Sequence, residues 1–184
     1  MIKTLVALVA SMTLGTFTLT IMRTDPLQPE KRTTLAAMKA KSAADLSPIV
    51  SQTAIPLDQD NWQRLVVHST GAEGAQLAQR CHFVIETTNN GYAKITATNL
   101  WSNQLQAVAT GNDANEISVC LKGDFSQNRP RERTFVALIR LVRELQKQCN
   151  IRGSNVYLRS ELPGRIASPG RAFPSQRFAS HLLK

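Results

Sequence analysis

The stretch "RERTFVALIRLVRELQKQC", residues 131–149, decides the fold. Its apolar residues recur at spacings of three and four, as they do along one face of an α-helix. These residues are Phe135, Leu138, Ile139, Val142, Leu145 and Cys149. Most charged residues of the stretch lie off this stripe, and Pro130 just before it suits a first helical turn. The pattern predicts an amphipathic helix over 131–149 with one buried face.

Short β-branched and apolar runs surround this helix. "RLVVH" (64–68) and "NVYL" (155–158) each indicate a strand, and "HFVIETTNNGYAKITATNL" (82–100) indicates a hairpin that turns at "NNG". "EISVCLKGDF" (116–125) is almost continuously apolar, which is typical of a central strand. Strands, a long helix and a further strand predict an α/β fold with a central mixed β-sheet flanked by helices. The tail after residue 160 is expected to be loop-like.

The chain divides into three parts by composition. Residues 1–23 hold a basic start and 19 uncharged residues, Thr4–Met22, so we expect a signal peptide or a membrane anchor; a buried core helix is the third reading. Four prolines punctuate residues 24–60, which we interpret as a linker. A domain is expected over 61–180. Basic residues directly after the apolar segment favour a cytoplasmic location for the linker and the domain, which conflicts with export of an uncleaved form.

The net charge is strongly positive. Lysine and arginine number 22 against 13 aspartates and glutamates, giving +9 at pH 7. Such a charge favours anionic partners, although a merely solubilising surface explains it equally well. Aromatic residues are only 5% of the chain, so stacking platforms for single-stranded nucleic acid are scarce and a nucleic-acid partner is not expected.

Several motifs occur together in a fixed order. They are "RLVVHST" (64–70), "CHFVI" (81–85), "ISVCLKGDF" (117–125), "VYLRSEL" (156–162) and "SPGRAFP" (168–174). This order resembles the type 2 N-acetylmuramoyl-L-alanine amidases and the peptidoglycan recognition proteins, over residues 62–178. The resemblance implies the amidase fold and a zinc hydrolase that cuts between muramic acid and the first alanine of the peptide stem.

The family's zinc is held by two histidines and a cysteine or aspartate, with one position open for water. By resemblance, His68 stands at the first ligand position, Arg159 at the second and Ser168 at the third. Cys81 stands where the family has its catalytic tyrosine. A further family histidine is matched by Val108, and an auxiliary basic residue by Ile166. His68 is thus the only metal ligand position retained.

This replacement pattern predicts a catalytically inactive member of the family. A guanidinium is a donor only and stays charged, so Arg159 beside His68 would repel Zn²⁺. The segment between Ser69 and Cys81 is also short, with room for barely two helical turns where the family has a longer wall of the groove. We therefore expect no confident catalytic residue, no metal and no cofactor; zinc would be needed only if the domain were an active amidase.

The remaining candidates have simple structural explanations. His68 is expected to be satisfied by a hydrogen bond, and His82 to pack in the interior, facing away from Cys81. Cys120 and Cys149 are expected to be small buried apolar residues. Three cysteines permit one disulfide at most. A rebuilt metal site that uses His68 and Cys81 remains an alternative.

Three functional interpretations arise from the resemblance. The first is a binding module for peptidoglycan or another anionic cell-wall ligand, in which His68, Arg159 and Ser168 line the site and Arg159 holds a carboxylate. The second is an active N-acetylmuramoyl-L-alanine amidase. The third is a non-enzymatic scaffold or assembly protein. All three place the protein in the cell envelope, exported or anchored to the membrane by its N-terminal segment.

Overall fold

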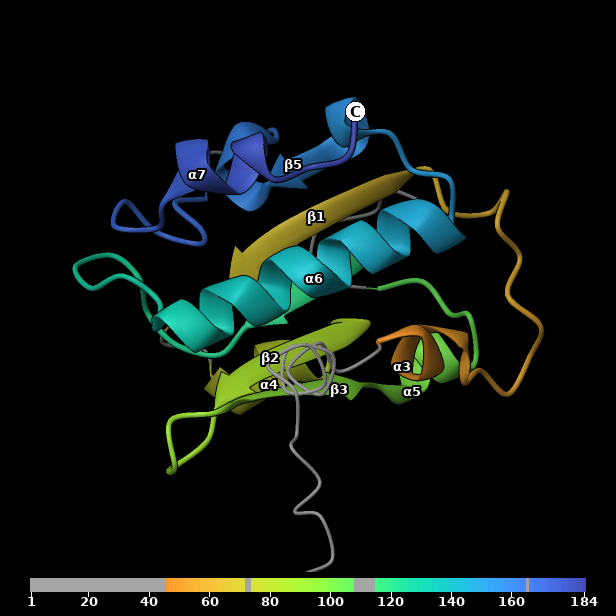
Figure 1. Cartoon of the computed structure of the whole chain (residues 1–184), viewed down its shortest axis with the longest axis horizontal. Helices are drawn as coiled ribbons and strands as arrows, with labels where there is room; N and C mark the ends of the chain where they lie inside the picture. Colours follow the sequence, from red (N-terminus) through yellow and green to blue (C-terminus); the bar gives the residue numbers. More distant parts are fainter. Residues whose placement is uncertain (1–45, 72–73, 108–114, 165) are drawn as a thin grey trace, which may run out of the picture. The chain divides into compact units, whose positions relative to one another are not determined.

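The computed structural model describes residues 46–71, 74–107, 115–164 and 166–184, which form one packed unit (Figure 1). The apolar N-terminal segment expected at 1–23 and Val108 lie outside these residues. Within the described residues, no helix has the length and apolar character needed to cross a membrane.

A five-stranded mixed sheet forms the centre of this unit (Figure 1). Its strands are β1 (Arg64–Ser69), β2 (Phe83–Thr87), β3 (Ala93–Ala97), β4 (Glu116–Leu121) and β5 (Val156–Leu158), in the spatial order β3-β2-β4-β1-β5. Strand β1 runs parallel to β4 and β5, β2 runs parallel to β4, and β2 and β3 form the expected antiparallel hairpin. The predicted fold class, the strands and the central place of 116–121 are confirmed.

Helix α6 (Glu132–Gln148) covers one face of the sheet. Its buried residues are Thr134, Phe135, Leu138, Leu141, Val142, Leu145 and Gln146. The predicted stripe is confirmed at Phe135, Leu138, Val142 and Leu145, whereas Ile139 is only partly buried. The buried face is therefore turned slightly from the predicted one, toward Leu141.

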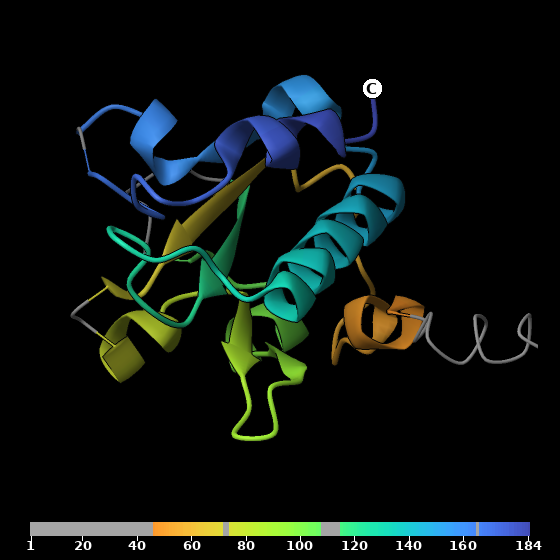
Figure 2. The same cartoon turned by 60° about the vertical axis from the view of Figure 1, so that its left-hand side comes forward.

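The two faces of the sheet have different partners. Side chains alternate along a strand, so Leu65 and Val67 of β1 and Val119 of β4 share one face and join α6 in the hydrophobic core. His68 and Cys120 point to the opposite face. Figure 2 shows α6 on one side of the sheet and the short helix α4 (Gly74–Ala78) on the other.

Two short helices occupy segments where the sequence predicts none. Helix α3 (Ser47–Ser51) lies inside the predicted linker, yet Val50 is buried in the core and its carbonyl accepts a hydrogen bond of 2.9 Å from Trp101 Nε1. Helix α7 (Ser175–Ser180) replaces the end of the loop-like tail and buries Phe178. The packed unit therefore begins before residue 61. The remaining short elements are α5 (Asn99–Ser102) and the 3₁₀ turns η2 (Gly153–Asn155) and η3 (Arg159–Glu161).

Truncation of the α6 core face should destabilise the domain. Leu138 is fully buried, so we expect Leu138→Ala to lower the free energy of unfolding by about 2–5 kcal/mol in urea titrations. Val136 lies on the same helix but is 37% exposed, and Val136→Ala serves as the control, with an expected change within about 0.5 kcal/mol. Equal losses in the two variants would show that the assigned face is wrong.

Candidate functional site

His68 lies near the end of β1, on the face of the sheet that α6 does not cover. In the parallel register it stands beside Cys120 of β4. Its side chain is 2% exposed, and Nε2 shares a hydrogen bond of 2.7 Å with Ser118 Oγ. The expectation that a hydrogen bond satisfies this imidazole is confirmed.

Ser168 reaches the strand position next to His68. Its Oγ accepts a hydrogen bond of 2.8 Å from the backbone N–H of Ser69, and its carbonyl accepts one of 2.8 Å from the N–H of Ser160. The side chain is buried. The hydroxyl thus holds the 168–174 loop against the end of β1, which is a structural role for this serine.

Arg159 follows the last residue of β5, and the parallel register β1–β5 brings this point of the chain alongside His68. Its guanidinium turns to its own loop, where Nη1 donates a hydrogen bond of 2.9 Å to the carbonyl of Pro163. The Nε atom is buried and has no hydrogen-bond partner among the described residues. Arg159 is half-buried and retains donor capacity for an anion.

Cys81 lies in the turn between α4 and β2, and its side chain contacts His68. Its Sγ lies 3.5 Å from His68 Nε2 and 3.0 Å from the carbonyl oxygen of Leu77 in α4. Cys120 completes a cluster in which the His68 nitrogen and the two sulfurs all lie within 4.8 Å of one another. The sequence predicts the proximity of His68 and Cys81 but not that of Cys120, because strand register has no local sequence signal.

The two thiols of this cluster influence each other's protonation. A hydrogen bond from the Cys120 thiol, opposed by burial and assisted by His68, lowers the pKa of Cys81 to about 5. The same bond to Cys81, together with burial, raises the pKa of Cys120. The Leu77 carbonyl favours the protonated Cys81 thiol, because a carbonyl accepts a hydrogen bond only from the S–H form. The cluster therefore stabilises at most one negative charge without a cation.

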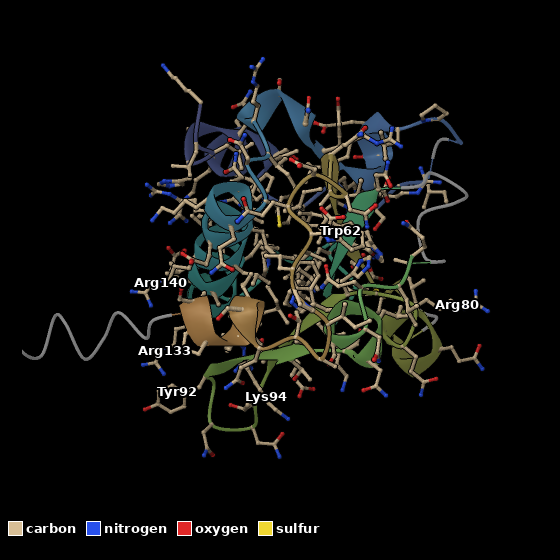
Figure 3. All side chains as sticks on the ribbon, turned by 90° about the vertical axis from the view of Figure 1, so that its right-hand side faces the viewer. Trp62, Arg80, Tyr92, Lys94, Arg133 and Arg140 are labelled. Carbon is tan, nitrogen blue, oxygen red and sulfur yellow. The ribbon has the colours of Figure 1, made fainter. Side chains whose placement is uncertain are left out.

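His82 is a packing histidine, as expected. Its Nδ1 accepts a hydrogen bond of 2.9 Å from the N–H of Ser118, so Nε2 carries the proton and donates to the Leu105 carbonyl at 2.7 Å. The ring makes edge contacts with Trp62 and Trp101. Trp62 is itself 2% exposed, whereas Arg80, Arg133 and Arg140 extend outward at the edges of the molecule (Figure 3). Burial lowers the pKa of His82 to about 4.

A groove of about 700 Å³ lies over β2 and β3, on the face of the sheet that carries His68 and Cys120. Val84 and Thr96 contribute to it, and the ends of Lys94 and Lys122 flank Glu86 at its rim. Lys122 donates a hydrogen bond of 3.1 Å to Glu86, and Lys94 lies 3.5 Å from the same carboxylate. Two cations and one anion leave the groove with a net positive charge.

The three positions that the sequence resemblance matches to the family's zinc ligands do not fit a zinc ion. Only His68 has a ligating side chain. Arg159 Nη1 donates to Pro163, and Ser168 Oγ is occupied by the Ser69 N–H. An ion at this point would face a guanidinium that stays protonated. The donor set is thus unsuited to the hydrolytic zinc of the family.

The mixed sheet, with its main helix on one face and the His68 cluster on the other, defines a domain of the amidase type. The N-acetylmuramoyl-L-alanine amidase family model matches residues 58–171, which is more than half of the chain. The protein therefore belongs to this family, and the resemblance found in the sequence is confirmed. A search of curated proteins found no match.

Solved structures of similar fold agree with this assignment. The chain is similar to the endolysin N-acetylmuramoyl-L-alanine amidase LysCS from Clostridium intestinale URNW, at 20% identity and a TM-score of 0.50, over 70% of this chain and 88% of that one. It is also similar to a selenomethionine derivative of AmpD, at 15% identity and a TM-score of 0.50, over 69% of this chain and 87% of that one. At such identities the likeness shows the shared fold.

Removal of the Ser168 hydroxyl should destabilise the domain even though no ligand is lost. Ser168→Ala leaves the buried Ser69 N–H without an acceptor, and an unsatisfied buried donor costs about 1–3 kcal/mol. Ser160→Ala, at an exposed neighbouring serine, is the control and should be nearly neutral. Urea titration measures both. No loss in Ser168→Ala would contradict the structural role of this hydroxyl.

His82 should stay neutral well below the pH at which a free histidine becomes charged. Because the pKa of His82 is lowered from 6.5 to about 4 in the folded state, only the unfolded state binds a proton at this residue between these two pH values. Stability should then fall as the pH drops below about 6.5, by about 1.4 kcal/mol per pH unit for this group. A titration of the imidazole signals by NMR measures the pKa directly. A midpoint near 6.5 for His82 would contradict its burial.

Proposed function

We propose that this domain binds peptidoglycan fragments and does not hydrolyse them. The observation that carries the proposal concerns the three positions matched to the family's zinc ligands: Arg159 and Ser168 make hydrogen bonds within the protein, so that of these three only His68 has a ligating side chain. An amidase of this family is a zinc hydrolase, and its water must be activated on the metal. Without that ion the groove retains only recognition.

The ligand expected in such a groove is anionic. Peptide stems carry carboxylates, and the positive rim formed by Lys94 and Lys122 lies on the same sheet face as His68. Arg159 adds a second cationic contact at the opposite edge of the sheet, at the end of β5. An extended stem peptide that crosses this face would therefore meet positive charge at both sides.

Arg159 is the contact most suited to specificity. Its Nη1 bond to Pro163 is exposed, so exchanging that bond for a ligand carboxylate costs little. A guanidinium also matches a carboxylate with two parallel N–H donors. Net charge alone would not select a stem carboxylate, whereas this geometry would.

The other interpretations make different demands. Hydrolysis is favoured by the family match, yet it requires a metal-activated water that the three family positions do not support. A scaffold role would leave the groove unused. Binding to peptidoglycan also implies a place in the cell envelope, with the N-terminal segment of residues 1–23 serving for export or anchoring.

A binding titration with matched arginine variants tests the proposal. The probe is a muropeptide prepared by muramidase digestion of peptidoglycan, titrated into the full chain at moderate salt. Loss of a charge-assisted hydrogen bond costs about 1.5–3 kcal/mol, so Arg159→Ala should weaken binding by roughly ten- to a hundredfold. Arg143→Ala, at an exposed arginine of α6, should have little effect because general charge attraction is screened.

The outcomes separate the three interpretations. Equal losses in both arginine variants would show that net charge alone binds the ligand, and an absence of binding by the unaltered chain would favour the scaffold. Release of stem peptides from peptidoglycan by the unaltered chain, followed by chromatography, would overturn the proposal in favour of an active amidase. We expect no release.

A further inference from the structure

Three soft donor atoms converge at one buried point of this domain. They are Nε2 of His68 and the sulfurs of Cys81 and Cys120, all within 4.8 Å of one another. The His68 side chain is 2% exposed and both cysteines are 0% exposed. The residues come from three segments: β1, the turn before β2, and β4.

We propose that His68, Cys81 and Cys120 form a buried binding site for a thiophilic divalent cation of the zinc class. Imidazole and thiolate are the ligands that such ions prefer. Zinc binds sulfur at about 2.3 Å and imidazole nitrogen at about 2.0–2.1 Å, and tetrahedral angles then separate the two donors by about 3.6 Å. The distance from Cys81 Sγ to His68 Nε2 is 3.5 Å.

Charge balance supports a dication at this point. Two thiolates and a neutral imidazole carry two negative charges, which a divalent ion neutralises, and a buried group without net charge avoids a large desolvation cost. Both sulfurs bind the ion as thiolates, so any proton that a thiol still holds is released to solvent and the freed sulfur lone pair bonds to the metal. The three family positions offer no such balance, because Arg159 would add charge of the same sign as the ion.

The Ser118 hydroxyl lies where a fourth ligand to the ion would be placed. Its hydroxyl lies 2.7 Å from His68 Nε2 and its side chain is buried. When Nε2 bonds to the ion, this hydrogen bond is released and the neutral hydroxyl oxygen remains beside the cluster. The ion would thus be enclosed by protein, as in structural metal sites, which lack the open position of a hydrolytic one.

Other uses of the cluster fit the geometry less well. A nucleophilic Cys81 would need a substrate within reach, yet its side chain is fully buried. The site also differs from the family's zinc position, because two of its three ligands, Cys81 and Cys120, lie outside the set of His68, Arg159 and Ser168. Its failure would therefore leave the proposed binding of peptidoglycan untouched.

Cobalt titration of the reduced full chain tests this site. One equivalent of Co²⁺ should produce thiolate-to-cobalt charge-transfer absorption and the intense visible bands of a tetrahedral ion, and Zn²⁺ should abolish both. Cys120→Ala should lose the charge-transfer bands. Cys149→Ala, which truncates the third buried cysteine on the α6 side of the sheet, should keep them. Absence of the bands in the unaltered chain, or equal loss in both variants, would overturn the proposal.

A second measurement covers the case in which Cys120→Ala does not fold. The unaltered chain is alkylated in partly denaturing urea with and without Zn²⁺, and mass spectrometry reads each cysteine. Zinc should protect Cys81 and Cys120 more strongly than Cys149. Equal protection of all three thiols, or the recovery of a Cys81–Cys120 disulfide that the reductant does not open and that leaves no metal bound, would contradict the site.

Discussion

The alternation of side chains across strands β1 and β4 is the constraint on which the rest of the structure depends. Every residue of β4 is buried, so both faces of the sheet are closed to solvent at this central strand. One face supplies Leu65, Val67 and Val119 to the core beneath α6. The other face carries His68 and Cys120, and any polar group there must find its partner within the protein.

The polar groups around His68 meet that requirement with partners inside the protein. The hydroxyl of Ser118 satisfies His68, and the Ser69 N–H satisfies the hydroxyl of Ser168. Arg159 turns its guanidinium toward Pro163 at the surface, since a guanidinium cannot be left in a dry interior without partners. At two positions that the sequence resemblance matches to zinc ligands, the side chains thus make ordinary hydrogen bonds, and the groove over β2 and β3 has a positive rim.

Much of this arrangement is readable in the sequence. The period of α6, the β-branched strands and the turn at 89–91 are local signals, and they predict the mixed sheet and its central strand. The ordered motifs predict the family, and by the same resemblance they predict that Arg159 and Ser168 replace zinc ligands. Helices α3 and α7 are not predicted, because each is short and buries a single side chain, Val50 in α3 and Phe178 in α7. Such a helix depends on tertiary packing and has no local sequence period. The place of Cys120 beside His68 depends on strand register, which is a long-range property.

The most direct measurement of this account is the anomalous scattering of zinc in crystals of the full chain grown with Zn²⁺. It locates the ion without reference to activity and distinguishes two sets of side chains on the same face of the sheet. The account predicts an anomalous peak bonded to His68, Cys81 and Cys120, with Arg159 still turned to Pro163 and Ser168 still bonded to Ser69. A peak coordinated by His68 and Ser168, with Arg159 moved aside and a water in the open position, would contradict it and restore a hydrolytic centre.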